Sequence, residues 1–179
     1  MKLFKLTIAI IVIVFLSSNY ASSQEIQPED RLTELGITLF EPTPPIANYV
    51  KAVTVGNIVY LSGHGPSRGD GTSVTGKVGE DLTIEEGYEA ARYCGISMLS
   101  TLKAEVGDLN RVKRVVKVLG MVNSGEGFTD QPKVINGFSD LMVDVFGENG
   151  KHARAAVGMA ELPSNIAVEI EMIVELKED

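Results

Sequence analysis

The chain has 179 residues, one cysteine, two histidines and a formal net charge of −8. This length is that of one ordinary domain. A single cysteine excludes an intrachain disulfide. The acidic balance argues against nucleic acid as a partner, because binding to a phosphate backbone needs a concentrated Lys/Arg surface.

The common motifs of metal and cofactor sites are missing from the sequence. Cys94, His64 and His152 are its only cysteine and histidine residues, so a zinc site would need distant carboxylates. There is no H-E-x-x-H, no G-x-S-x-G and no phosphate-binding glycine loop. We therefore expect metal-free chemistry with no cofactor.

Residues 1–23 have the composition of a secretory signal peptide. Lys2 and Lys5 precede an uncharged apolar run, residues 6–16, and small and polar residues follow. This run is shorter than the roughly 20 residues needed to span a bilayer. We expect cleavage after Ser23 and export, to the periplasm or outside the cell, with no stable membrane anchor; an uncleaved signal anchor is the alternative. Cleavage removes two lysines and no acid, so the charge becomes −10.

Residues 24–43 are expected to form a leader with one short helix, which begins near Pro28 and ends at Gly36. The domain then covers residues 44–179. Its first two β-type runs, residues 49–54 and 58–62, meet at a Gly-Asn pair, which predicts a hairpin. The polar, glycine-rich residues 67–79 predict a surface loop.

Two helices and three further strands are predicted after this loop. Residues 83–106 begin with a capping-box pattern, Thr83 and Glu86, and carry one apolar stripe. Residues 130–146 predict the second helix. Residues 111–122, 154–159 and 166–176 predict strands, which gives the order β-β-α-β-α-β-β. This order indicates an α+β fold, a mixed sheet with both helices on one face.

Arg154 lies in a strand of small and apolar residues. Period-two alternation puts Arg154, Ala156 and Gly158 on one face. A permanently charged guanidinium with small neighbours needs an anion, supplied either by a ligand carboxylate or by an acid of the protein itself. Both readings remain open at this point.

Two further features carry titratable groups. Glu169, Glu171 and Glu175 share one face of the last strand, and acids are costly to bury unless paired. That face therefore meets solvent, a subunit boundary or a site. His64 follows the hairpin in the run L-S-G-H-G-P, where it could exchange protons near neutral pH or serve a structural role.

Several short segments of the sequence together carry a family resemblance. They are N-Y-V at residues 48–50, Y-L-S-G at 60–63, N-G at 136–137, H-A-R-A-A-V at 152–157, L-P at 162–163 and V-E-I-E at 168–171. The most specific part is R-x-x-V, then L-P, then V-E-I-E. Over about residues 44–176 the chain thus resembles the YjgF/RidA family, in its chorismate-mutase-like endoribonuclease branch.

This resemblance implies a chorismate-mutase-like (YjgF) fold and a homotrimer with ligand clefts between neighbouring subunits, the free sheet face lining the trimer interior. The implied activity is hydrolysis of enamine and imine acids to 2-keto acids and ammonia. By position, Arg154 matches the arginine that holds the substrate carboxylate, and Glu169 matches the acid near the attacking water. The remaining implied cleft residues are Tyr49, Ser62, Gly63, His64, Asn136 and Ala156.

Two positions depart from the archetypal deaminases, which carry a cysteine at Ala156 and usually a glutamine at His64. The departures keep an alternative open, a non-catalytic trimer that binds small carboxylates in the same clefts. A ribonuclease, which the branch name implies, is disfavoured by the acidic charge.

Overall fold

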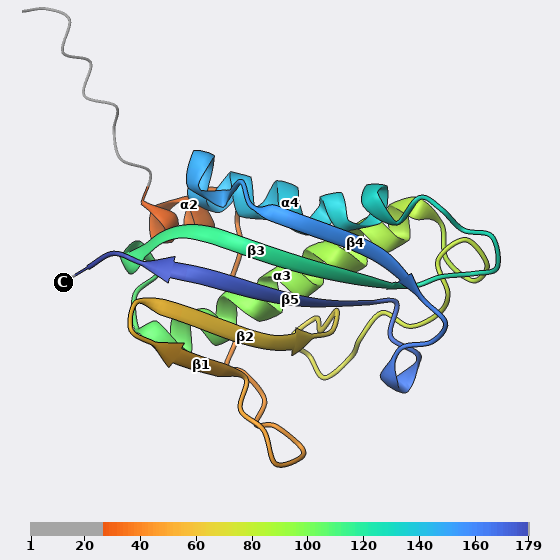
Figure 1. Ribbon diagram of the computed structural model, residues 1–179, viewed down its shortest axis with the longest axis horizontal. Helices are drawn as coiled ribbons and strands as arrows, with labels where there is room; N and C mark the ends of the chain where they lie inside the picture. Colours follow the sequence, from red (N-terminus) through yellow and green to blue (C-terminus); the bar gives the residue numbers. More distant parts are fainter. Residues whose placement is uncertain (1–26, 179) are drawn as a thin grey trace, which may run out of the picture.

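The computed structural model describes residues 27–178 (Figure 1). The predicted signal peptide, residues 1–23, lies outside this part, so export stays a prediction. Among the described residues, no helix is both long enough and apolar enough to cross a membrane.

Five strands form one mixed sheet in the order β1-β2-β5-β3-β4. The pair β3 and β4 is parallel, and all other neighbours are antiparallel. A parallel pair needs a crossover connection, and here α4 provides it. The strands are β1 (Ala52–Val55), β2 (Ile58–His64), β3 (Val112–Asn123), β4 (Ala153–Met159) and β5 (Val168–Leu176).

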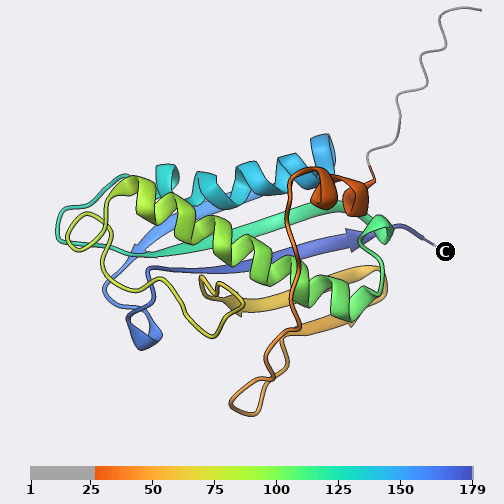
Figure 2. The same cartoon turned by 180° about the vertical axis from the view of Figure 1, so that it is seen from behind.

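The two long helices cover one face of this sheet, and within residues 27–178 no helix lies over the other face (Figures 1 and 2). Thr83 caps α3 as predicted: its hydroxyl accepts from the amide of Glu86 at 3.1 Å, and its own amide donates to the Glu86 carboxylate at 2.8 Å. The helices are α2 (Pro28–Glu34), α3 (Ile84–Val106) and α4 (Gln131–Phe146), with short 3₁₀ turns η1 (Leu109–Arg111), η2 (Gly147–Gly150) and η3 (Pro163–Asn165).

The predicted α+β fold is therefore confirmed, and the differences lie at the ends of strands. The first strand begins at Ala52 rather than at residue 49, and the last begins at Val168 rather than at residue 166. The backbone before β5 pairs instead with the loop: the amide of Ala167 donates to the carbonyl of Val74 at 3.0 Å. A trimer remains a prediction.

The core lies between the helices and the sheet, where Met98, Phe138 and Ile170 are fully buried. The helices α3 and α4 meet at Gly137, where any Cβ would collide with the backbone carbonyl of Tyr88. Only glycine permits this close approach. It fixes how α4 lies on the sheet, and therefore where the side chains of α4 reach β4.

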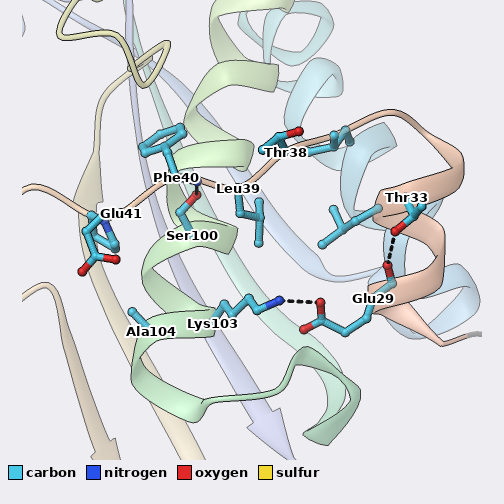
Figure 3. Close-up of a pocket in the computed structure, with 12 residues that line it drawn as sticks. Glu29, Thr33, Thr38, Leu39, Phe40, Glu41, Ser100, Lys103 and Ala104 are labelled. Atoms are coloured by element: carbon cyan, nitrogen blue, oxygen red, sulfur yellow. Dashed lines mark hydrogen bonds and ion pairs between the residues drawn. The ribbon is translucent and has the colours of Figure 1, made fainter.

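The leader packs against the outer side of α3 (Figure 3). Leu32 is buried, and the carboxylate of Glu29 forms an ion pair with Lys103 at 2.6 Å and accepts from the amide of Leu109 at 3.1 Å. Farther along, the amide of Phe40 donates to the hydroxyl of Ser100 at 3.3 Å. These contacts enclose a hollow of about 480 Å³ between the leader and α3.

The open face of the sheet carries large apolar side chains that remain exposed. Val55 is 61% exposed, Tyr60 48% and Val157 39%. Val55 and Tyr60 lie on the neighbouring strands β1 and β2, whereas Val157 lies on β4 at the opposite edge of the sheet. Exposed apolar side chains on neighbouring strands are typical of an interaction site.

The structure places His64 in the core, on the helix side of β2, so its predicted role as a cleft group is not supported. His64 is only 4% exposed. Nδ1 donates to the carbonyl of Ser62 at 2.7 Å, and Nε2 accepts from the hydroxyl of Thr101 at 2.8 Å. The carbonyl can only accept, so the hydrogen sits on Nδ1. Both nitrogens are satisfied within the chain.

Burial lowers the pKa of His64 below its ordinary value of 6.5, with a smaller contribution from the charge of Lys51, and the hydrogen bond with Ser62 opposes them in part. The folded state therefore prefers the neutral ring, whereas the unfolded state takes up a proton at about pH 6.5. We expect stability to be complete above that pH and to decrease as the pH falls through it. The measurement is the urea midpoint at several pH values, for wild type and His64→Gln.

The His64→Gln variant should lose only part of this pH dependence. The rest remains because His152 and all the carboxylates, which also titrate, are present in both proteins. Equal pH dependence in the two proteins would contradict the assignment of a neutral, buried His64.

Candidate functional site

The predicted site residues that reach the surface fall into two groups. The first, which we call the arginine group, consists of Arg154, Asn136 and Ala156. The second, the glutamate group, consists of Glu169, Gly63, Ser62 and Tyr49.

Arg154 lies on β4, the edge strand of the sheet, and its side chain points toward α4. The guanidinium Nη1 donates to Asn136 Oδ1 at 3.0 Å and to Ser139 Oγ at 2.9 Å. Asn136 and Ser139 are three residues apart on α4, so both face the strand. Ala156 lies on the same face of β4 and packs against the core.

Neutral oxygens hold this guanidinium, and no acid does. No ion pair joins Arg154 to a carboxylate within residues 27–178, which decides against the internal salt bridge that the sequence left open. Among the same residues, Nε and Nη2 of Arg154 have no hydrogen-bond partner. The group thus keeps a full positive charge and two donating nitrogens for an external anion.

Ser139 and His152 lie beside the arginine group, and the sequence analysis did not predict either as a site residue. His152 Nε2 lies 3.1 Å from Ser139 Oγ, and Nδ1 lies 2.7 Å from the carbonyl of Gly150. Burial lowers the pKa of His152, and the charge of Arg154 lowers it further, against the hydrogen bond with Gly150. A signal existed for both: Ser139 is one helical turn from Asn136, and His152 is two residues from Arg154.

A hollow of about 240 Å³ lies beside the guanidinium, on the outer side of α4 and β4. Its lining is mostly polar or charged. The lining residues are Ser139, Asp140, Val143, Lys151, His152 and Arg154.

The glutamate group lies where β2 meets β5. The pairing of the two strands is irregular between Leu61 and His64. At this irregularity the Glu169 carboxylate occupies the space where a side chain of Gly63 would be, so any Cβ there would collide with it. A side chain at position 63 would therefore displace the Glu169 carboxylate, a contact that no local sequence pattern indicates.

Ser62 fixes the segment before β1 to this place. Its hydroxyl donates to the carbonyl of Val50 at 2.7 Å, and its amide donates to that of Lys51 at 2.9 Å. Tyr49, next to Val50 in the chain, is 47% exposed. The structure thus brings the backbone of Tyr49 to the glutamate group.

Glu169 is half-buried, and burial raises its pKa; the negative charge of Glu171 on the same strand face raises it further. A carboxylate with a raised pKa exchanges protons more readily near neutral pH than an ordinary one does. A raised pKa is one property expected of a general acid or base.

The arginine and glutamate groups do not meet within one chain. Arg154 on β4 lies opposite Val118 on β3, and Val118 lies opposite Met172 on β5. Glu169 is three residues from Met172, so the two backbones are about 10 Å apart across the sheet and about 10 Å apart along it. The Arg154 side chain faces the helices, and that of Glu169 faces the open side. One small ligand cannot contact both side chains of the same chain.

Three other features of residues 27–178 do not provide a competing reactive centre: the hollow at the leader, the thiol of Cys94 and the acidic side chains as metal ligands. The hollow at the leader contains none of the predicted site residues, and its one lysine is paired with Glu29. Cys94 is buried, and burial raises the pKa of its thiol well above the ordinary value. No group of three His, Cys, Asp or Glu residues within 27–178 is arranged to hold a metal ion.

Comparison with known proteins gives consistent matches. Residues 29–176 match the family described as "YjgF/chorismate mutase-like, putative endoribonuclease". Protein TCP17 of Trypanosoma cruzi is 48% identical over 146 residues, which is 81% of this chain and 91% of that protein. A 2-iminobutanoate/2-iminopropanoate deaminase of Dermatophagoides farinae is 34% identical over 134 residues, 74% of this chain and 89% of that protein.

Comparison with solved structures leads to the same family. The crystal structure of Atu1372, a protein of unknown function from Agrobacterium tumefaciens, superposes with a TM-score of 0.77 at 46% identity, over 84% of this chain and 94% of that one. The match to the family, the identity with both relatives and the shared fold show that this chain belongs to the YjgF/RidA family.

Proposed function

We propose that this protein hydrolyses enamine and imine acids to 2-keto acids and ammonia, in clefts between the subunits of a homotrimer. In the hydrolysis, water adds to the imine carbon, the C–N bond breaks, and nitrogen leaves as ammonia. One observation carries the proposal: a guanidinium anchored by neutral oxygens, with two nitrogens directed to no partner among the described residues.

Arg154 is the group that binds the substrate carboxylate. Nε and Nη2 form the planar pair of donors that matches the two oxygens of a carboxylate. Asn136 and Ser139 hold the third nitrogen, so the plane of the guanidinium is set before the substrate arrives. Orienting an imine that hydrolyses readily in water supplies much of the required acceleration.

Glu169 is the group that moves protons. In its ionised form it accepts a proton from the water that attacks the imine carbon, and in its protonated form it returns that proton to the departing nitrogen. Its raised pKa keeps both forms accessible nearer to neutral pH. Gly63 leaves the carboxylate the space for this role.

The separation of the two groups is the reason for proposing a cleft between copies. Because one ligand does not contact Arg154 and Glu169 of the same chain, a second copy must supply one of them. The exposed apolar face, which includes Val55, Tyr60 and Val157, is suited to contact that copy. In a closed ring, each interface joins the arginine group of one copy to the glutamate group of the next.

The Dermatophagoides farinae relative, a 2-iminobutanoate/2-iminopropanoate deaminase by name, supports this choice of substrate class. One observation favours a second candidate, a trimer that binds small carboxylates without catalysis. Ala156 supplies no reactive group beside Arg154, and the only thiol of the chain is buried in the core. Binding of a keto acid without turnover of any imine would select this candidate.

Arg154→Ala should reduce kcat/KM for ammonia release by 100-fold or more, on the order expected for losing a charge-assisted, bidentate contact. Arg154→Lys should recover only part of this loss, because an ammonium cannot form the paired contact. The measurement is ammonia released from imines that an amino-acid oxidase generates in the assay. Arg92→Ala, which removes an arginine from α3, is the matched control and should behave as wild type.

The oligomeric state of each variant is measured in parallel, since a change of assembly would remove activity for another reason. Equal rates for wild type and an Arg154→Ala protein of unchanged assembly would exclude the deaminase.

Activity should fall at low pH as Glu169 becomes protonated, at a pH above that expected for an ordinary carboxyl group. Glu171→Gln removes a negative charge that raises the pKa of Glu169, so this fall should move to lower pH. The measurement is kcat/KM as a function of pH. Glu175→Gln removes the same charge farther along that face and should leave the profile in place; an equal shift in both variants would argue against Glu169 as the titrating group.

A further inference from the structure

We propose that Ser139 and His152 are positioning residues for Arg154, linked to it in a hydrogen-bond chain of fixed direction that orients the guanidinium toward the carboxylate of the ligand. The inference rests on the proposed function of Arg154 as the carboxylate-binding group. It assigns to both residues an effect that is transmitted through Arg154.

The donor-to-acceptor direction of this hydrogen-bond chain follows from one acceptor at its end. The carbonyl of Gly150 can only accept, so the hydrogen of the His152 ring is on Nδ1, 2.7 Å away. In the neutral ring Nε2 is then an acceptor, and it takes the hydroxyl hydrogen of Ser139 across 3.1 Å. A serine hydroxyl has one hydrogen, so its oxygen is left to accept from Arg154 Nη1 at 2.9 Å.

The end of the hydrogen-bond chain, at the carbonyl of Gly150 and the ring of His152, is held rigidly. Gly150 is buried, and it packs so closely on the backbone of α4 that any Cβ would collide with the carbonyl of Met142. The ring of His152 also makes an edge contact with the ring of Phe138, with centroids 6.1 Å apart and planes at 76°. A fixed carbonyl and a fixed ring leave Ser139 one orientation of its hydroxyl.

The chain orients the guanidinium without neutralising it. An anchoring carboxylate would compete with the carboxylate of the ligand, whereas a hydroxyl and a neutral imidazole do not. Two charged side chains that line the same hollow have partners other than Arg154: Lys151 pairs with Glu148 at 2.7 Å, and Asp140 accepts from the hydroxyl of Tyr88 at 3.0 Å. Neither forms an ion pair with Arg154.

The first test compares Ser139→Ala with Ser139→Thr, which keeps the hydroxyl. We expect Ser139→Ala to raise KM, and the Kd for 2-oxobutanoate, by about tenfold, the order expected for one hydrogen bond to a charged group, with a smaller change in kcat. Ser139→Thr should stay close to wild type. Ser100→Ala, which removes a helical serine hydroxyl remote from the arginine group, is the matched control.

His152→Asn provides a second variant that does not depend on the folding of the first. Asparagine keeps a donor toward the carbonyl of Gly150 but removes the acceptor that receives the Ser139 hydrogen. It should reproduce the tenfold weakening. Unchanged KM and Kd in both Ser139→Ala and His152→Asn would overturn the proposal.

The second test observes the hydrogen-bond chain directly, without an enzyme assay. The protein has two histidines, so ¹⁵N NMR resolves each ring and reports which nitrogen carries the hydrogen. We expect the hydrogen of His152 on Nδ1, and a shift of the Nε2 resonance in Ser139→Ala, with His64 unchanged. A hydrogen on Nε2 in the wild type would refute the direction of the chain.

The two tests separate this inference from the proposed function. A wild type that releases no ammonia removes the deaminase, yet the NMR signals and the binding of 2-oxobutanoate still decide whether Ser139 and His152 position Arg154.

Discussion

Side chains alternate between the two faces of a β-strand, and this constraint decides where the chemistry of the chain lies. Arg154 is on the face of the sheet that the helices cover, at its edge, whereas Glu169 is on the open face. No adjustment of rotamers brings the two together, because the sheet backbone lies between them. The site that the family resemblance implies is therefore divided between two surfaces of one subunit, and the proposed trimer is what would reunite them.

The second determinant is electrostatic. The α4 helix presents an amide and a hydroxyl, rather than a carboxylate, to the guanidinium of Arg154. The position of α4 depends in turn on Gly137, which allows α3 to approach closely. Packing in the core and charge at the surface are thus connected: the contact between helices determines which atoms reach the guanidinium.

Much of the fold could be predicted because its signals are local. Capping at Thr83 and the alternation of faces in β5 each act over a few residues, and the structure has both. The ends of β1 and β5 were misjudged because pairing with residues distant in the sequence decides where a strand begins. The loop that pairs with the backbone of Ala167 leaves no mark in the sequence around β5.

The site could be predicted only in part. Arg154 and Asn136 followed from the resemblance, but their contact with Ser139 and His152 depends on a crossover that brings α4 back to β4. Of the two roles that the sequence left open for His64, the structure has the structural one: the irregular pairing near Gly63 directs its ring into the core, where Thr101 forms a hydrogen bond with it. Burial of a polar ring depends on a partner that sequence alone does not reveal.

The central claim, a site shared between copies, is tested most directly by mixing two defective proteins. Arg154→Ala and Glu169→Gln subunits carry different tags, are co-expressed in equal amounts, and the mixed assemblies are purified through both tags. If each cleft takes the arginine of one copy and the glutamate of its neighbour, every trimer that contains both variants has one intact cleft, about a third of the total, and ammonia release should recover accordingly. Mixed assemblies that contain both tags and remain as inactive as their parents would contradict the account.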